Sequence, residues 1–281
     1  QVNDSSRTYQ VRAPADGYII RISRRDYYHF FIEHSCNLYT NFIVVHNLSE
    51  RVLSEAEFRS DNHSFTRIKV NEGEVIGEIR NHPFDFSVHD TTVNLTGFAS
   101  PEYYEVEPWK IHTVDPFDYF TEPLASQLRN KSLRQVKPVS GVIDYDVEDR
   151  LVGNWFLSNC SDYACSPIYY KGHLSIVYNH IDPSAIIISI GELEEIYGVK
   201  GNAPDPANVT VGELISYDLV SFDYYVNDEF WDRQTHNDNI TVRTGSEVQE
   251  SILLQLIDNH TLRVELTNQS TFSPNARIYH R

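Results

Sequence analysis

Short runs of β-branched and aromatic residues, separated by turn-forming residues, recur along nearly the whole chain and most constrain its fold. Residues 18–22, 28–32 and 42–46 are three such runs, with turn clusters between them. Two glycines punctuate a further pair of runs within 68–79, and another run covers 84–88. Successive strands without long intervening helices favour antiparallel sheets. The sequence therefore predicts an all-β, mainly antiparallel protein.

The second half of the chain continues this pattern. Its clearest element is a hairpin, in which residues 251–257 and 261–267 flank the turn-forming Asp258-Asn259-His260. The alternation in the second arm indicates that one face is in contact with water. Strands are predicted near 142–147, 151–157, 173–179, 185–190, 214–226, 239–243, 251–257, 261–267 and 276–280.

The length of 281 residues suggests two domains, each large enough for its own core, with one large β domain as the alternative. Residues 122–135 carry leucines at helical spacing, and Pro138 and Gly141 then mark a boundary. We predict an N-terminal β domain over 1–120, a linker with one short connecting helix over 121–140, and a second β-sandwich or barrel domain over 141–281.

The pattern Asn-x-Ser/Thr, the acceptor signal for N-glycosylation, is strongly enriched. It occurs ten times, against roughly three expected by chance for this composition. Turn-forming Asn, Ser and Thr co-occur in loops anyway, but this explains only some of the sites. Each glycan is bulky and hydrophilic, so each glycosylated asparagine must face solvent. The predicted sites are Asn3, Asn47, Asn62, Asn94, Asn130, Asn159, Asn208, Asn239, Asn259 and Asn268.

Cysteine usage also indicates an oxidising compartment. Cys160 and Cys165 lie in a turn-rich stretch and are predicted to form a small disulfide loop. Cys36 is left over, and we expect it to be a buried strand thiol rather than an intermolecular bridge. The chain lacks methionine, so Gln1 is not an initiator and we expect a processed, secreted product whose signal segment has been removed.

Charge and hydropathy restrict the partners. The formal charge of −17 disfavours nucleic acids and anionic lipid surfaces, which would be repelled. An acidic solvated surface is the preferred explanation of this charge, so the charge names no partner. The chain has no apolar run of the roughly 18 to 20 residues that cross a bilayer, so we expect no membrane span.

Three segments between residues 11 and 88 resemble the lysostaphin-type (LytM-like) zinc endopeptidases. They read VRAPADGYI at 11–19, IEHSCNLYTNFIVVHNLS at 32–49 and VNEGEVIG at 70–77. These segments are similar to the family's V-x-A-P-x-D-G-x-V, I-x-H…Y-T-x-Y-x-H-L-S and V-x-x-G-x-x-I-G stretches. The resemblance covers a quarter to a third of the chain and implies a duplicated hybrid motif, a β-rich fold.

The zinc ligands of that family are missing from this sequence. Active members need an upstream H-x-x-x-D and a later H-x-H-F, which hold the metal and leave one position for water. No histidine precedes Ala13, and Pro83 and Asp85 stand where the later histidines would fall. The resemblance therefore implies a catalytically inactive relative, and we predict no catalytic residues, metal ligands or cofactor.

Two weaker patterns have structural explanations. A residual metal site from His34, His46, His82, His89 and Asp85 lacks ligand spacing, and structural histidines are the preferred reading. Residues 153–155, Gly-Asn-Trp, faintly resemble the strand that opens lipocalin-type barrels, but we prefer a glycine bend beside a core tryptophan.

Three functional hypotheses follow. The first is a secreted, N-glycosylated, non-catalytic structural or surface protein that self-associates into a layer, sheath or filament. The alternative is an extracellular module that binds cell-wall or surface polysaccharide, as an adhesin or regulator, through a degenerate peptidase fold. The third is a hydrolase whose carboxylate pair is not visible from spacing. A carboxylate with a raised pKa in a cleft would favour the third hypothesis.

Overall fold

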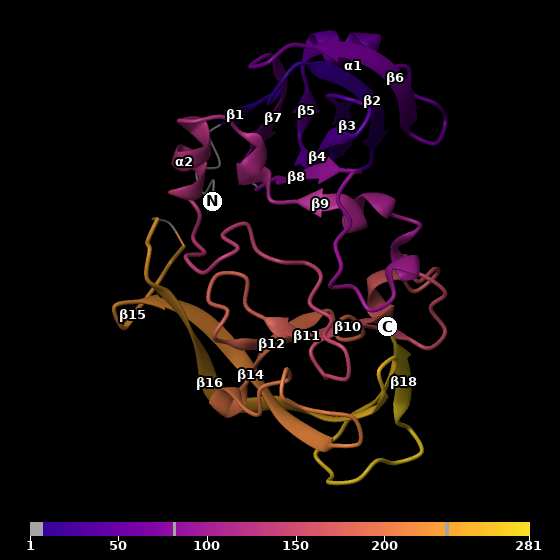
Figure 1. Ribbon diagram of the computed structural model, residues 1–281, viewed down its shortest axis with the longest axis vertical. Helices are drawn as coiled ribbons and strands as arrows, with labels where there is room; N and C mark the ends of the chain where they lie inside the picture. Colours follow the sequence, from indigo (N-terminus) through magenta and orange to yellow (C-terminus); the bar gives the residue numbers. More distant parts are fainter. Residues whose placement is uncertain (1–7, 81–82, 234–235) are drawn as a thin grey trace. The chain divides into compact units, whose positions relative to one another are not determined.

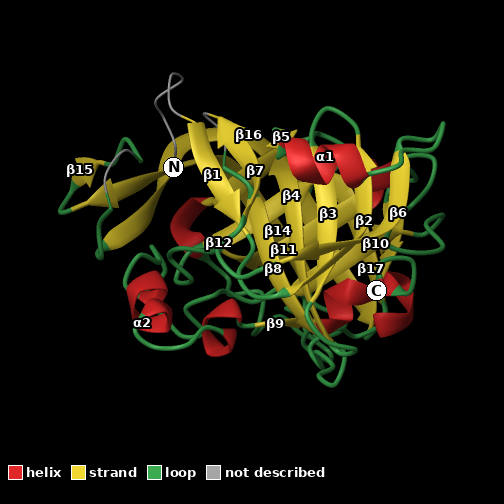
Figure 2. Ribbon diagram, turned by 90° about the horizontal axis from the view of Figure 1, so that it is seen from above, coloured by secondary structure: helices red, strands yellow, loops and turns green. Residues whose placement is uncertain are grey.

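The computed structural model describes residues 8–80, 83–233 and 236–281, and strands account for most of its regular structure (Figure 2). The strands pair antiparallel throughout, which confirms the predicted all-β class. The described chain divides into two compact units. The first comprises Gln1–Asn94 and His112–Ala125, and the second comprises Leu95–Ile111 and Ser126–Arg281.

This division differs from the one predicted from sequence, because residues 95–111 and 126–140 belong with the second unit. The predicted connecting helix is also shorter, since α2 spans Leu124–Arg129 and a turn at Asn130-Lys131-Ser132 follows it. The last predicted helix leucine, Leu133, packs instead against an apolar cluster of the second unit.

The first unit contains a six-stranded and a three-stranded antiparallel sheet. Their orders are β6-β2-β3-β4-β8-β9 and β1-β7-β5. Buried apolar side chains such as Ile19, Phe30, Ile68 and Ile76 form the core of this unit. The elements are β1 (Thr8–Arg12), β2 (Gly17–Arg24), β3 (Tyr28–Glu33), β4 (Leu38–Val45), β5 (Asn47–Leu48), α1 (Glu50–Glu55), β6 (His63–Val70), β7 (Val75–Arg80), β8 (Asp85–Asp90) and β9 (Thr113–Val114).

The second unit is a closed sheet in which each long strand pairs with its sequence neighbour. Its strands are β10 (Gly153–Leu157), β11 (His173–Tyr178), β12 (Ile186–Ile190), β13 (Glu195–Val199), β14 (Leu214–Val226), β15 (Glu229–Phe230), β16 (Ile240–Asp258), β17 (Thr261–Leu266) and β18 (Arg277–His280). Pairing of β13 with β14 and of β18 with β10 closes the sheet into a barrel. A barrel was one of the two architectures predicted for this domain, the other being a sandwich. The short β15 pairs with β14 outside the ring.

Inward-facing apolar side chains, which alternate with outward-facing ones along the strands, fill the interior of this barrel. Trp155, Ile176, Ile188, Tyr217 and Leu254 are among its fully buried side chains. The predicted hairpin is present as β16–β17, with Leu254 opposite Val264. The strands predicted at 239–243 and 251–257 form one continuous β16, because the exposed polar residues between them still pair through the backbone with β14 (Figure 1).

One predicted strand is absent and one observed strand was not predicted, each for a local reason. Residues 142–147 form no strand. The side chains of Asp144 and Asp146 accept hydrogen bonds from the backbone N–H groups of Gly97, Ala99 and Asn154, and these bonds take the place of strand pairing. The strand β13 was not predicted, since Glu194 and Glu195 precede a single buried tripeptide, Tyr197-Gly198-Val199, and give little apolar periodicity.

Candidate functional site

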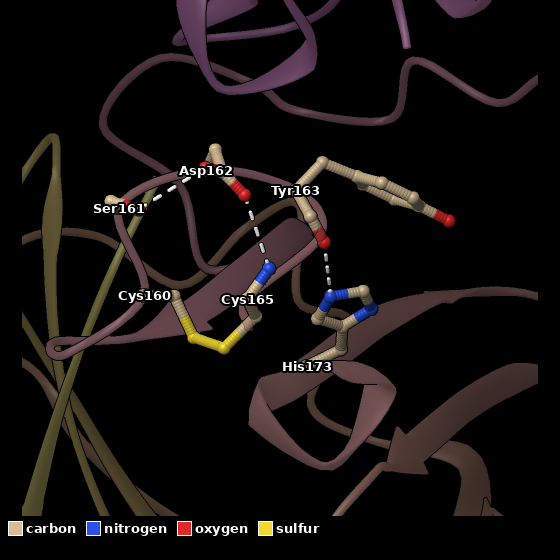
Figure 3. The surroundings of a disulfide bond; sticks show 6 residues. All are labelled: Cys160, Ser161, Asp162, Tyr163, Cys165 and His173. Atoms are coloured by element: carbon tan, nitrogen blue, oxygen red, sulfur yellow. Dashed lines mark hydrogen bonds between the residues drawn. A yellow bond between two sulfur atoms is a disulfide. The ribbon is translucent and has the colours of Figure 1, made fainter. Parts of the chain in front are cut away.

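The disulfide predicted from sequence is present and lies beneath an aromatic cluster on the outer face of the barrel. Cys160 and Cys165 are bonded to each other, and both side chains are buried (Figure 3). Gly172 packs directly against them, because a Cβ at this position would stand 2.3 Å from the Cys165 Sγ and 2.6 Å from the Cys160 Sγ. The bond therefore fixes a short loop against the strand that follows it.

This loop positions Tyr163. The Tyr163 backbone N–H donates to the Tyr103 carbonyl at 2.7 Å, which ties the loop to the 95–111 segment. The Tyr163 carbonyl in turn accepts a hydrogen bond of 2.8 Å from the Nε2 of His173 on β11, and Figure 3 shows the two groups facing each other. The loop is thus held from both sides.

The bond to a carbonyl determines the protonation of His173. Nε2 must carry the proton, which leaves Nδ1 as an acceptor when the ring is neutral. Burial lowers the pKa of His173 and the nearby ammonium of Lys110 lowers it further, while the Tyr163 carbonyl and Glu107 act in the opposite direction. His173 is therefore neutral at pH 7.

A layer of aromatic rings covers the outside of β10. Trp155 points into the barrel core, while its neighbour Phe156 points outward into this layer. The Tyr104 ring lies 4.2 Å from that of Phe98 and 5.3 Å from that of Tyr163, measured between ring centroids. Residues 95–111 belong to the second unit because these rings bury one another there.

A cavity of about 340 Å³ opens beside this layer, and we call it the aromatic pocket. Lys110 lies at its wall, with its Nζ 4.3 Å from the Tyr163 ring centroid and 3.3 Å from a Glu107 carboxylate oxygen. Carboxylates are not among its lining residues, which are Phe98, Tyr104, Lys110, Val142, Ile143, Tyr145, Asn154, Trp155, Phe156, Tyr163, His173, Ser175 and Val177.

Two of the lining polar atoms that lack a protein partner within the described ranges lie in the aromatic layer and on β11. One is the hydroxyl of Tyr104, a residue that is 4% exposed and is held in the aromatic layer by its ring. The other is the Nδ1 of His173. Beside them, the Ser175 hydroxyl donates to the Asn154 Oδ1 at 2.9 Å. The pocket thus combines aromatic faces with hydroxyl, amide and imidazole groups.

A half-buried carboxylate, that of Asp146, lies at a neighbouring cavity of about 320 Å³. Burial raises the pKa of Asp146, although hydrogen bonds from the Asn154 and Ala99 backbone N–H groups oppose the shift. One oxygen accepts from Asn154 at 2.7 Å and the other from Ala99 at 2.9 Å. Because both oxygens hold backbone segments together, we interpret Asp146 as a structural clamp rather than as a hydrolytic acid.

The predicted sequons lie at the surface. Asn3 is outside the described residues. Asn259 is half-buried, and its Oδ1 accepts from the Asp149 N–H and from Arg281. By contrast, both buried asparagines of the described chain, Asn41 and Asn179, are outside sequons. The exposed sequon asparagines are Asn47, Asn62, Asn94, Asn130, Asn159, Asn208, Asn239 and Asn268.

The residues weighed as a residual metal site have separate surroundings. His34 contacts the Asp16 carbonyl and the Thr40 hydroxyl, and the buried His89 contacts the hydroxyls of Ser87 and Thr113. Asp85 is exposed at the start of β8. The Nδ1 of His46 accepts from the Arg80 N–H. His82 is outside the described residues.

Across the described ranges, no group of three or more His, Cys, Asp or Glu side chains is placed to hold a metal ion. Nor does any described helix have the length and apolar character needed to cross a membrane. The prediction for Cys36 was wrong, since this residue is exposed in the turn between β3 and β4 rather than buried in a strand. Four residues of polar, turn-forming character separate these strands, and this places the thiol in solvent.

Sequence reasoning did not find the aromatic pocket. Its lining residues come from several segments between 98 and 177, so no local spacing marks them. The one signal in the sequence is the concentration of proline and aromatic residues at 99–120, which by itself names no function. Comparison of the chain with protein-family models, with curated proteins and with solved structures gave no match in any of the three. Function is therefore argued from the geometry.

Removing the disulfide is expected to destabilise the second unit. Replacing both Cys160 and Cys165 by serine should lower the free energy of unfolding by about 2 kcal/mol, from the entropy of closing so short a loop. Urea unfolding measures the change, and Cys36→Ser, at an exposed thiol, is the control. A double variant as stable as the Cys36→Ser protein would contradict the expectation.

Stability should also decrease in mild acid. Because the pKa of His173 is lower in the folded protein than in the unfolded chain, the unfolded chain binds more protons below about pH 6.5. The free energy of unfolding then decreases as the pH falls through that value, and levels off below the folded pKa. Thermal unfolding between pH 8 and 5 measures the slope.

The matched variant for this slope is His173→Gln, which keeps an N–H donor for Tyr163 without a titrating ring. We expect a shallower slope, with a remainder from His180, whose pKa burial and Arg233 also lower. An unchanged slope in the variant would show that His173 does not titrate as the geometry indicates.

Proposed function

We propose that the protein is a secreted, N-glycosylated, non-catalytic surface or structural protein that associates with copies of itself. The observation that supports glycosylation most strongly is the surface placement of the sequon asparagines, set against the two buried asparagines outside sequons. The bonded cysteine pair is compatible with an oxidising, extracellular compartment. The resemblance to LytM-like enzymes remains a proposal for the first unit, as an inactive relative.

Self-association is supported by an open sheet edge in the first unit. The strand β6 pairs with β2 on one side and ends the six-stranded sheet on the other. Unpaired strand edges are templates for pairing with another chain. Near the start of β6, the Phe65 side chain is 58% exposed.

Two basic side chains lie beside Phe65. Guanidinium groups of Arg59 and Arg21 lie 4.9 Å and 5.8 Å from the centre of the Phe65 ring. With a formal charge of −17, a second copy offers many carboxylates to such a basic and aromatic edge. We therefore propose that β6 docks on an acidic surface of another copy, an attraction that salt weakens.

Glycosylation is tested on protein secreted from eukaryotic cells. Glycopeptide mass spectrometry should find glycans on most of the exposed sequons, and enzymatic removal should lower the mass accordingly. Protein that carries no glycan at any of the described sequons would overturn this half of the proposal.

Association is tested by light scattering and electron microscopy at increasing concentration. The wild type should form assemblies that salt dissociates, and Phe65→Asp should remain monomeric. The matched control is Phe230→Asp, because Phe230 is 63% exposed but belongs to β15 of the second unit. Wild-type protein that stays monomeric at high concentration would overturn self-association, and equal loss in both variants would overturn the role of β6.

A further inference from the structure

The aromatic pocket has the composition of a site for a ligand that is partly apolar and partly hydroxylated. Its volume of about 340 Å³ falls in the range of small-molecule sites. The rings of Phe98, Tyr104 and Tyr163 supply apolar faces and edges. Residues of the barrel strands β10 and β11 form the floor of the pocket, so the site is built on rigid elements rather than on loops alone.

Its polar groups are placed to bind hydroxyls. The Tyr104 hydroxyl can donate or accept, and the His173 Nδ1 can accept, and neither has a partner among the described residues. Both atoms are accessible to solvent, so a ligand hydroxyl bonds to them in place of water. Asn154 and Ser175, already joined by a hydrogen bond of 2.9 Å, add further donors and acceptors at the same wall.

The charge of the pocket narrows the ligand class. In a protein with 40 acidic residues, none of the pocket-lining side chains is a carboxylate. The only charged lining group is the Lys110 ammonium, which Glu107 balances at 3.3 Å. A cationic ligand therefore has no counter-charge here, whereas a neutral or weakly acidic one is accepted.

We propose that the aromatic pocket binds one pyranose ring of a saccharide. A pyranose has an apolar face of C–H groups that stacks on an aromatic ring, and a rim of hydroxyls that need both donors and acceptors. The Tyr163 ring receives the C–H face, because the Tyr104 ring is itself covered by its aromatic neighbours. The hydroxyls of the rim form hydrogen bonds with the Tyr104 hydroxyl, the His173 Nδ1 and the Asn154–Ser175 pair.

The sugar could belong to an external polysaccharide or to the N-glycan of another copy. The chemistry is the same in both cases, and the pocket does not depend on the proposed function. The second source does rest on it, because it requires glycosylated copies that associate.

The first arm of the test measures binding by protein whose glycans have been removed. The probes are the methyl glycosides of glucose, mannose, galactose, N-acetylglucosamine and glucuronic acid, followed by saturation-transfer NMR and titration calorimetry up to 50 mM. Saturable binding of at least one is expected. Tyr104→Phe removes a single hydroxyl and should weaken binding about fivefold, the effect of one hydrogen bond. Tyr163→Ala should weaken it about tenfold or more.

Tyr170→Phe is the matched control, since it removes the hydroxyl of a tyrosine that is 55% exposed and does not line the pocket. Its affinity should equal that of the wild type. Thermal unfolding of each variant verifies that loss of binding is not loss of folding. Absence of binding by every probe, or equal affinity in wild type, Tyr104→Phe and Tyr163→Ala, would overturn the proposal.

The second arm identifies the source. Glycosylated wild-type protein is assembled with and without the sugar that binds best. Dissociation by the sugar, together with failure of Tyr163→Ala to assemble, would assign the ligand to the glycans of a neighbouring copy. Assembly that the sugar and the variant leave unchanged would refute that source and assign the ligand to an external saccharide, whatever the outcome for β6.

Discussion

Replacing Trp155 by alanine is expected to lower the free energy of unfolding of the second unit by about 4 kcal/mol. Trp155 is fully buried in the barrel core, and its indole N–H donates to the Leu151 carbonyl at 3.1 Å. The substitution leaves a large cavity that surrounding strands cannot fill, because the closed sheet fixes their separation. The midpoint of thermal unfolding should drop by about 10 °C for a unit of this size.

Calorimetry measures this change, with Phe230→Ala as the control. Phe230 is also a large aromatic residue of the second unit, but it is 63% exposed, so its loss should change stability by less than about 0.5 kcal/mol. A Trp155→Ala protein that unfolds at the same temperature as Phe230→Ala would show that the barrel core is not packed around Trp155.

Replacing Arg281 by methionine is expected to cost about 3 kcal/mol. The Arg281 side chain is buried and bonds to the carbonyls of Val147, Arg150, Val152 and Asn259 at 2.8–3.1 Å. Methionine preserves much of the side-chain volume but removes the guanidinium donors of all four carbonyls, of which Val147 keeps a second donor in the Arg150 N–H. Burial lowers the pKa of Arg281, and the charge of Asp146 opposes the shift, so the guanidinium remains the charged donor.

Urea unfolding of Arg281→Met, Arg281→Lys and Arg67→Met tests this. Lysine has three donors on one atom and cannot span acceptors on four residues, so Arg281→Lys should fall between wild type and Arg281→Met. Arg67 forms an exposed ion pair with Glu33, and its loss should cost less than about 1 kcal/mol. Equal stability of Arg281→Met and Arg67→Met would contradict the role assigned to Arg281.

The two largest effects should not be additive. The Arg281 guanidinium carbon lies 4.2 Å from the centre of the Trp155 ring, so each substitution also removes a partner of the other. Gly153 shows how tightly this region is packed, because a Cβ there would lie 2.5 Å from an Asp146 carboxylate oxygen and 2.7 Å from Arg281 Nη1. The Gly-x-Trp pattern noted in the sequence is thus a core element, in agreement with the preferred interpretation.

Elements with local alternation were predictable from sequence. The β16–β17 hairpin was found because its arms alternate and a turn of three polar residues joins them. The exposed sequons were found for a similar reason, since Asn and Ser or Thr within three residues favour turns, and turns lie at the surface. Residues 142–147 were predicted wrongly because their apolar residues alternate as a strand does, while their aspartates bind backbone groups elsewhere.

The sequence by itself determined the all-β class, most strand positions, the disulfide pair and the sequons, because each depends on residues close together in the chain. Only the tertiary structure decided that the second sheet closes, that residues 95–111 pack on β10, and that Tyr104, Tyr163 and His173 share one pocket. These features depend on contacts between residues tens of positions apart. Periodicity reports which face of a strand is apolar, but not which distant segment will cover it.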